Sequence, residues 1–296
     1  MRKDRLDGVG VALLTLSAVL FGINQVVIKV VDAGLQPVFF AGLRSLGAFV
    51  CIWGWMVWQG RPPRIAPGTV GAGVLIGLVF SAEFLCLFMA LDRTTVVRSS
   101  IIFYSMPLWL SIAAHYGLPG ERITWLKAMG LALAFAGVAW ALLHRGAGHG
   151  QASVSGDLLA LGGALAWAGV AFLSRASAMA RVRPDMQLLW MVGVSGPVLI
   201  AASIFFGPLV RDLTWLAVGG LLFQIVVVVA AGFILWLWLL SVYPASTVSS
   251  FSFLTPILSM GFGWLLLGEP ISAAILLAAA MVAVGIVLIT RAPKAG

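Results

Sequence analysis

Ionisable side chains inside apolar segments are the residues of this sequence most able to do chemistry. Glu83 lies in an apolar run at 68–91, and Arg44 lies in another at 37–58. A charge at the centre of a bilayer costs about 2.5–3.5 kcal/mol on insertion scales, which makes such residues functional hypotheses. At the rise of an α-helix, Glu83 lies about 12 Å and Arg44 about 10 Å from the same, outer end of these runs. The matched depths favour a mutual pair.

The Glu83–Arg44 pattern has several interpretations. The two charges would bind a zwitterionic or ionic substrate, or Glu83 would act as a proton-linked carboxylate. A structural ion pair, or an Arg44 side chain that extends to the interface, would give the same pattern. Lys29 and Arg175 occupy equivalent positions in the two halves of the chain, near opposite faces. They are candidate gates, although basic residues that snorkel from helix ends would look identical.

Two prolines follow stripes of polar and aromatic residues at helical spacing. The stripes and their prolines are Ser100, Tyr104 and Pro107 in one segment, and Ser249, Phe253 and Pro256 in another. Residues three or four apart share a helix face. Proline bends a helix, and the freed carbonyl is tolerated in a membrane only beside protein or water. The pattern predicts two bent helices that line a central cavity, with ordinary packing through small residues as the alternative.

Other residues deep in the apolar runs are candidates for lining that cavity. The aromatic candidates, which would suit an apolar or cationic group, are Phe80, Phe84, Tyr104, Trp109, Trp167 and Phe253. Asn24 and Gln224 are mid-membrane amides that would bind a polar substrate group or bond between helices. Plain packing is the competing interpretation for every aromatic residue.

The sequence contains none of the common catalytic or metal-binding motifs. It has no HExxH, no nucleophile elbow and no P-loop lysine, and Cys51 and Cys86 form neither a disulfide framework nor a metal pattern. We therefore expect that the protein is not an enzyme and binds no metal and no cofactor.

Composition places these residues in a membrane. The chain is 61% hydrophobic and 9% charged, far from the charged share of about a quarter in soluble domains. Ten apolar runs are long enough to cross about 30 Å of hydrocarbon. We expect them at 9–31, 37–58, 68–91, 97–116, 123–143, 156–180, 185–206, 214–240, 245–267 and 272–290. We expect no signal peptide before the first run.

The positive charge of the chain predicts its orientation. With the N-terminus inside, eleven Lys and Arg residues fall on the inner side and four on the outer side, namely Arg93, Arg98, Arg145 and Arg211. The positive-inside rule then puts both termini in the cytoplasm. The net charge of +8 reflects the orientation of the chain in the membrane, so we expect no nucleic-acid partner.

The chain repeats itself after about half its length. Pro107 precedes Gly120-Glu121-Arg122-Ile123-Thr124, and Pro256 precedes Gly268-Glu269-Pro270-Ile271-Ser272. We expect the two Gly-Glu pairs to form structural turns rather than a site. The repeat predicts domains at 1–148 and 149–296 with five helices each. Because five is odd, the repeats are inverted, as in transporters with a midplane site.

These features resemble the EamA branch of the drug/metabolite transporter superfamily. The resemblance rests on the ten runs, the two repeats and the string of Pro, Gly-Glu-x-Ile-Ser/Thr, Ala and Gly in each half. Within that branch the chain looks like a YddG-type exporter of aromatic and other amino acids. The resemblance implies ten helices around a central cavity, an inner-membrane location and efflux. It carries over no catalytic residue, and Gly232 stands where the second repeat would match Glu83.

Three functions remain open at this point. The first is export of amino acids, aromatic and other neutral ones above all, by alternating access. The second is export of cationic drugs or other small metabolites. The third is a passive channel or a non-transporting membrane scaffold. We expect a small-molecule substrate and the lipid bilayer as partners, and the sequence leaves energy coupling and oligomeric state open, with a monomer as one option.

Overall fold

A computed structural model describes residues 7–118, 123–144, 153–243, 251 and 254–291. These residues form helices joined by short connections, and the extended pairing among them is an isolated bridge between Leu35 and Val210. The first half contains α1 (Gly8–Asp32), α2 (Pro37–Trp58), α3 (Val70–Arg93), α4 (Val96–Phe103), α5 (Met106–Gly117) and α6 (Trp125–Leu143). The second half contains α7 (Val154–Ala176), η1 (Ala178–Arg181), α8 (Pro184–Ser203), α9 (Trp215–Phe223), η2 (Gln224–Gly232), α10 (Phe233–Val242), α12 (Leu254–Leu267) and α13 (Ala273–Arg291).

The helices have the length and apolarity of membrane spans. Among the described residues, eight helical segments are long and apolar enough to cross a bilayer, with α4 and α5 counted as one and α9 continued by η2 and α10. Two further apolar helices, Leu254–Leu267 and Ala273–Ile289, are shorter as described. The chain is therefore a multi-pass membrane protein.

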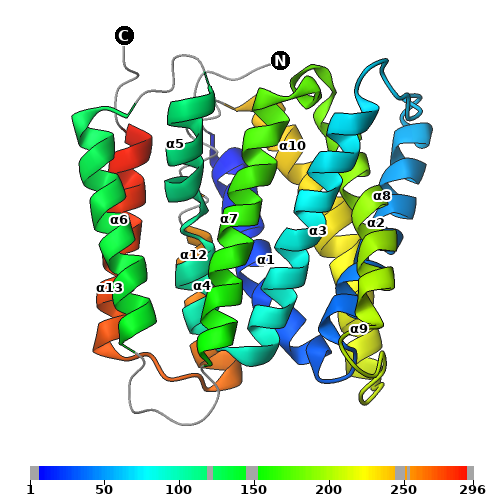
Figure 1. Ribbon diagram of the computed structural model, residues 1–296. Coiled ribbons are helices and arrows are strands. Elements are labelled where there is room, and N and C mark those ends of the chain that lie inside the picture. The colour runs from blue at the N-terminus through cyan, green and yellow to red at the C-terminus, as the bar shows by residue number, and fades with distance from the viewer. Residues whose placement is uncertain (1–6, 119–122, 145–152, 244–250, 252–253, 292–296) are drawn as a thin grey trace.

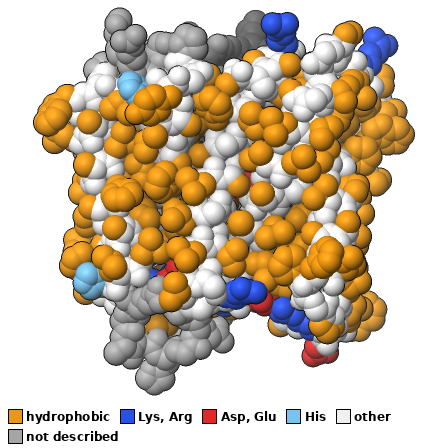
Figure 2. All heavy atoms as spheres, in the orientation of Figure 1, with side chains coloured by type: hydrophobic (Ala, Val, Ile, Leu, Met, Phe, Trp, Pro, Cys, Tyr) orange, Lys and Arg blue, Asp and Glu red, His pale blue; other side chains and the backbone are white. Residues whose placement is uncertain are grey.

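The arrangement of the bundle agrees with a membrane setting. The helices run roughly side by side, and α1 begins at the end of the bundle where α13 finishes (Figure 1). On the face shown in Figure 2, hydrophobic side chains cover most of the height, and Lys and Arg side chains gather near the two ends. We call the end that carries the α1–α2, α3–α4 and α8–α9 connections the far end.

Two spans depart from a regular α-helix. The fourth span breaks after Phe103 and resumes at Met106, with Pro107 in the first turn of α5. The eighth span is π-helical over Gln224–Gly232, which no sequence pattern predicted. Pro256 lies near the start of α12, and the residues just before α12 are outside the described part.

Small residues set the closest helix contacts. α6 and α13 lie side by side at one edge of the bundle (Figure 1). A Cβ built on Gly130 would lie 2.6 Å from the carbonyl oxygen of Gly285, and a Cβ on Gly285 would lie 2.6 Å from that of Gly130. The two backbones touch where both residues lack a side chain, as small-residue packing in membranes predicts.

Candidate functional site

Arg44 and Glu83 are buried opposite charges with incomplete hydrogen bonding among the described residues. Arg44 on α2 is 2% exposed and Glu83 on the neighbouring α3 is 4% exposed. Arg44 Nε and Glu83 Oε2 have no hydrogen-bond partner among the described residues. Their charges attract one another, yet they form no ion pair within 4 Å. The direct pair that the matched depths favoured is thus absent from the described residues.

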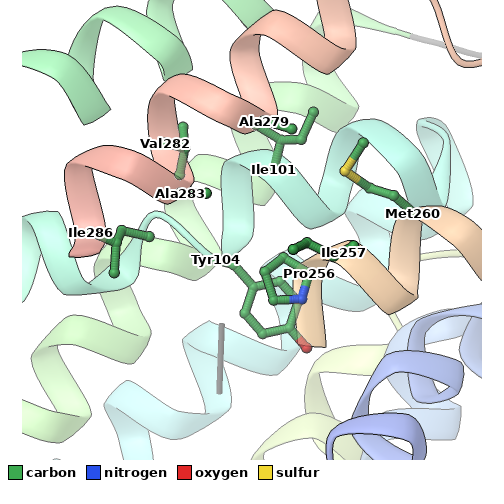
Figure 3. Close-up of a pocket in the computed structure, with 9 residues that line it drawn as sticks. All are labelled: Ile101, Tyr104, Pro256, Ile257, Met260, Ala279, Val282, Ala283 and Ile286. Carbon is green, nitrogen blue, oxygen red and sulfur yellow. The ribbon is translucent and has the colours of Figure 1, made fainter. Parts of the chain in front are cut away.

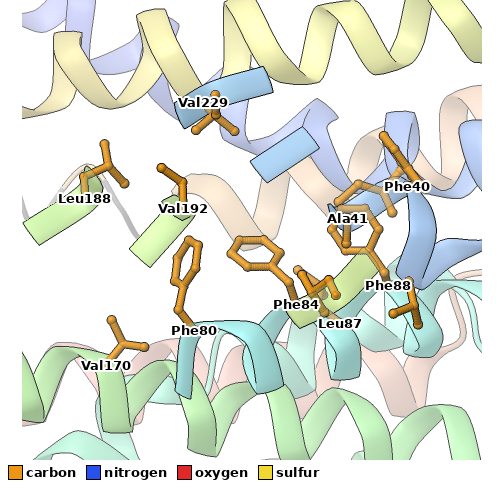
Figure 4. Packing of buried hydrophobic residues seen from close by; sticks show 14 of the residues in the cluster. Phe40, Ala41, Phe80, Phe84, Leu87, Phe88, Val170, Leu188, Val192 and Val229 are labelled. Atoms are coloured by element: carbon orange, nitrogen blue, oxygen red, sulfur yellow. The ribbon is translucent and has the colours of Figure 1, made fainter. Parts of the chain in front are cut away.

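Aromatic rings surround Arg44. Its guanidinium carbon lies 3.9 Å from the ring centroid of Phe84 and 5.4 Å from that of Phe88, which is cation–π geometry. Phe80 packs edge-on against Phe84, with centroids 4.6 Å apart. These rings belong to the main hydrophobic cluster, in which side chains of α2, α7, α8 and η2 face those of α3 (Figure 4). The rings favour the charged form of Arg44 without satisfying its donors.

A second polar group joins α1, α4 and α12. Ser100 Oγ donates a hydrogen bond to Gln25 Oε1 at 3.0 Å, and Ser259 Oγ donates to the Gly22 carbonyl at 2.8 Å. The Tyr104 hydroxyl lies beside the side chains of Gln25 and Ser259. Gln25 Nε2 is buried without a partner among the described residues. Sequence reasoning found Ser100 and Tyr104 but missed Gln25 and Ser259, although their polar side chains in apolar runs were a usable signal.

Trp167 on α7 covers one side of this group. Its ring stacks on Phe103 with centroids 5.0 Å apart and meets Tyr104 edge-on at 5.8 Å. The structure thus brings Tyr104 and Trp167 together. Trp109 is not part of this wall: its Nε1 donates to Ser105 Oγ at 3.1 Å, and its ring meets Phe135 of α6. The helix breaks at Tyr104 and Ser105, between Phe103 on α4 and Trp109 on α5.

The two mid-membrane amides bind each other. Gln224 Nε2 donates to Asn24 Oδ1 at 2.6 Å, which links α1 to the start of the π-helix. Gln224 Oε1 remains without a partner among the described residues. Of the two alternatives, the bond between helices is the one that the structure contains.

A small apolar cavity of about 30 Å³ lies between α4, α12 and α13 (Figure 3). Its lining consists of Ile101, Tyr104, Pro256, Ile257, Met260, Ala279, Val282, Ala283 and Ile286. Of the described candidate residues, Tyr104 and Pro256 line it. Ser249 and Phe253 lie outside the described residues.

The candidate gates sit at helix ends. Lys29 Nζ donates to the carbonyls of Leu91 at 2.9 Å and Thr94 at 2.5 Å, so it binds the C-terminal end of α3. Arg175 is exposed in the last turn of α7. Basic residues that cap a helix end, or that extend from it to the membrane interface, occupy the same kinds of position.

Asp157 is another buried acid, and its partner Arg98, which the sequence analysis put on the outer side, is also buried. Arg98 on α4 is 3% exposed and binds Asp157 on α7, with Nη2 and Oδ2 2.6 Å apart. Arg98 also donates to the carbonyls of Ala141 and His144, and Thr94 Oγ1 donates to Asp157. Sequence reasoning misplaced Arg98 because it is near the end of an apolar run.

Glu269 has a structural role, as the turn predicted, but a longer-range one. Its two carboxylate oxygens accept the main-chain N–H groups of Val96 at 2.9 Å and Val97 at 2.8 Å. A residue of the second half thereby caps the N-terminus of α4 in the first half. The corresponding Gly120–Glu121 turn lies outside the described residues.

Nothing in the described residues suggests a metal centre. They contain no group of three or more His, Cys, Asp or Glu side chains suited to a metal ion. What the arrangement offers is recognition: two buried opposite charges, aromatic rings, and amide and hydroxyl groups with free hydrogen-bonding atoms.

The helices and these polar clusters define a multi-pass membrane protein of the transporter class. The model of the EamA-like transporter family matches residues 8–143 and again residues 154–291, so the chain belongs to that family. The chain is 30% identical to the uncharacterized transporter YvbV of Bacillus subtilis over 96% of this chain and 92% of that protein.

A more distant relative and a solved structure are also similar to this chain. The chain is 26% identical to a probable amino-acid metabolite efflux pump of Escherichia coli, over 96% of this chain and 94% of that protein. A solved crystal structure shares the fold, with a TM-score of 0.66 at 20% identity over 94% of this chain and 96% of the other. The family is one of transporters, and the two named relatives carry the names of a transporter and an efflux pump.

Proposed function

We propose that the protein is a secondary transporter that exports amino acids across the inner membrane by alternating access. Neutral amino acids with aromatic or other apolar side chains are the favoured substrates. The observation that carries this proposal is the pair of buried, separated and incompletely bonded charges of Arg44 and Glu83. A buried charge without a partner costs several kcal/mol, so a ligand that completes both would be bound strongly.

A zwitterion completes both charges at once. Its carboxylate would accept hydrogen bonds from Arg44, and its ammonium would donate to Glu83. The Phe80, Phe84 and Phe88 rings beside Arg44 would contact an apolar side chain. The efflux-pump relative supports the same substrate class, since its name refers to amino-acid metabolites.

The proposed architecture is ten spans in two inverted repeats, at 1–148 and 149–296, with both termini cytoplasmic. The two matches to one family model support the repeat, and the charge asymmetry supports the orientation. Under this orientation the far end faces the outside. Because Arg44 and Glu83 are both buried, substrate entry requires rearrangement between the repeats. A monomer is sufficient for this scheme.

The second candidate is an exporter of cationic drugs or other metabolites. Glu83 and the aromatic rings favour it. Arg44 disfavours it, because its guanidinium occupies the face of Phe84 where a cation would bind. A channel or scaffold would leave the two buried charges without a purpose.

Counterflow in proteoliposomes, measured over the standard amino acids and a set of organic cations, tests the proposal. We expect saturable exchange of neutral amino acids, and we expect other amino acids to inhibit this exchange by competition. Exchange of cations alone would favour the second candidate. Conductance without saturation would indicate a channel, and no flux at all in folded protein would contradict transport.

A further inference from the structure

The C-terminal end of α1 holds a buried carboxyl group without a partner. Asp32, the last residue of α1, is 2% exposed, and both of its carboxyl oxygens lack a hydrogen bond among the described residues. Burial of an unpaired carboxylate is strongly unfavourable. The negative end of the helix dipole adds to this cost. The place of Asp32 in the fold therefore disfavours the anion.

The neighbouring cations are engaged elsewhere. Arg211 Nη1 donates to Asp92 Oδ1 at 2.5 Å and to the main-chain oxygen of Asp32 at 2.8 Å, and Nη2 donates to Asp92 Oδ2 at 3.2 Å. Lys29 Nζ donates to two carbonyls at the end of α3. Both cations attract the Asp32 carboxyl only from a distance, and Asp92 repels it.

The α8–α9 loop packs against the end of α1 that carries Asp32, and Arg211 of this loop binds the Asp32 main-chain oxygen. The α8–α9 loop lies along the α1–α2 turn: Gln36 N donates to the Leu209 carbonyl at 3.0 Å, and Arg211 N donates to the Gly34 carbonyl at 3.0 Å. A Cβ on Gly34 would lie 2.6 Å from the carbonyl oxygen of Asp212, so the approach is tight. Asp212 itself is exposed. Moving this loop away would admit water to Asp32.

We propose that Asp32 binds a proton when the far end of the bundle closes and releases it when that end opens. The physical reason is linkage: the state that binds more protons becomes more populated as pH falls. Closure is therefore favoured at low pH and lost as pH rises. Arg211 does not supply this dependence, because the hydrogen bond that it donates to the Asp92 carboxylate raises the pKa of Arg211 and keeps it charged.

The proposal adds a pH dependence to the proposed function. If the far end faces outside, acid outside favours the conformation that is closed to the outside. A proton that binds at closure and leaves when the same end opens returns to the outer side, so this link controls closure and does not by itself carry a proton across the membrane. This consequence rests on the proposed function, whereas the link between closure and Asp32 does not.

Spin labels test the link directly. Ser155 and Leu213 are exposed positions at the far end, on α7 and on the α8–α9 loop, and Cys51 and Cys86 would be replaced first. We expect the short-distance fraction to grow as pH falls from about 9 to about 5, a range that spans the titration of a perturbed carboxyl group. Asp32→Asn should fix that fraction at all pH values, whereas the matched control Asp212→Asn should keep the dependence. A wild-type fraction that ignores pH, or a dependence that survives Asp32→Asn, would overturn the proposal.

Transport assays separate this proposal from the proposed function. Counterflow in the wild type should depend on the pH at the far end, because acid favours closure there. Asp32→Asn should remove that dependence and keep counterflow. No counterflow in the wild type would count against the transport function. Counterflow whose pH dependence is unchanged in Asp32→Asn, or wild-type counterflow that ignores pH, would overturn the proton site alone.

Discussion

At the scale of residues, the fold treats its buried charges in two ways. Arg98, Asp157 and Glu269 have hydrogen bonds on all of their charged side-chain groups. Arg44 and Glu83 each keep a buried atom without a partner. A complete hydrogen-bond network is typical of charges with a structural role, and an incomplete one is typical of groups that bind a ligand.

The Arg98–Asp157 pair should therefore matter for stability. Arg98→Gln leaves the Asp157 carboxylate, which is 0% exposed, without its counter-charge. We expect a loss of about 3–5 kcal/mol, because breaking one side of a buried pair uncovers the other charge. Thermal unfolding in detergent would measure it. The double variant Arg98→Leu with Asp157→Leu should recover much of the loss; a double variant as unstable as the single one would contradict this account.

At the scale of elements, the glycine contact between α6 and α13 determines how closely the repeats join. Gly130→Ala places a methyl group where the Gly285 carbonyl oxygen lies 2.6 Å away. We expect destabilisation by about 1–3 kcal/mol through overpacking. Gly261→Ala is the matched control, since nothing lies within 4 Å of its Cβ position. Equal melting temperatures for the two variants would show that the contact is loose.

The elements were easier to predict than their contacts. Apolar run length predicted the spans, and Pro107 predicted the break between α4 and α5. The π-helix at Gln224 was missed because it has no local sequence signal. The bonds from Gln25 to Ser100 and from Glu269 to Val96 join residues 75 and 173 positions apart, so they depend on tertiary packing that one sequence does not reveal.

At the scale of the whole molecule, the proposed topology has a direct test. Cysteines at Arg64 and Leu213, both exposed, should label from opposite sides of the membrane, in a background without Cys51 and Cys86. We expect Arg64→Cys to react from the cytoplasm and Leu213→Cys from outside, as the charge asymmetry predicts. Reaction of both from one side would contradict the orientation and the helix order together.

The central claim is that Arg44 and Glu83 hold the two ends of a zwitterion. Each charge-assisted hydrogen bond is worth about 1.5–3 kcal/mol, or about tenfold or more in affinity. Arg44→Gln and Glu83→Gln should therefore each weaken exchange at least about tenfold, while Arg93→Gln, at an exposed position, should not. All variants should be checked for normal yield and dispersity.

The most direct measurement is competition of counterflow by an aromatic amino acid, its methyl ester and its deaminated acid. In the wild type only the intact zwitterion should compete well. The ester should lose no further affinity in Arg44→Gln, and the deaminated acid should lose none in Glu83→Gln, because each variant removes the group that the ligand no longer needs. Equal competition by all three ligands in the wild type, or losses that simply add in the variants, would contradict a site made by these two charges.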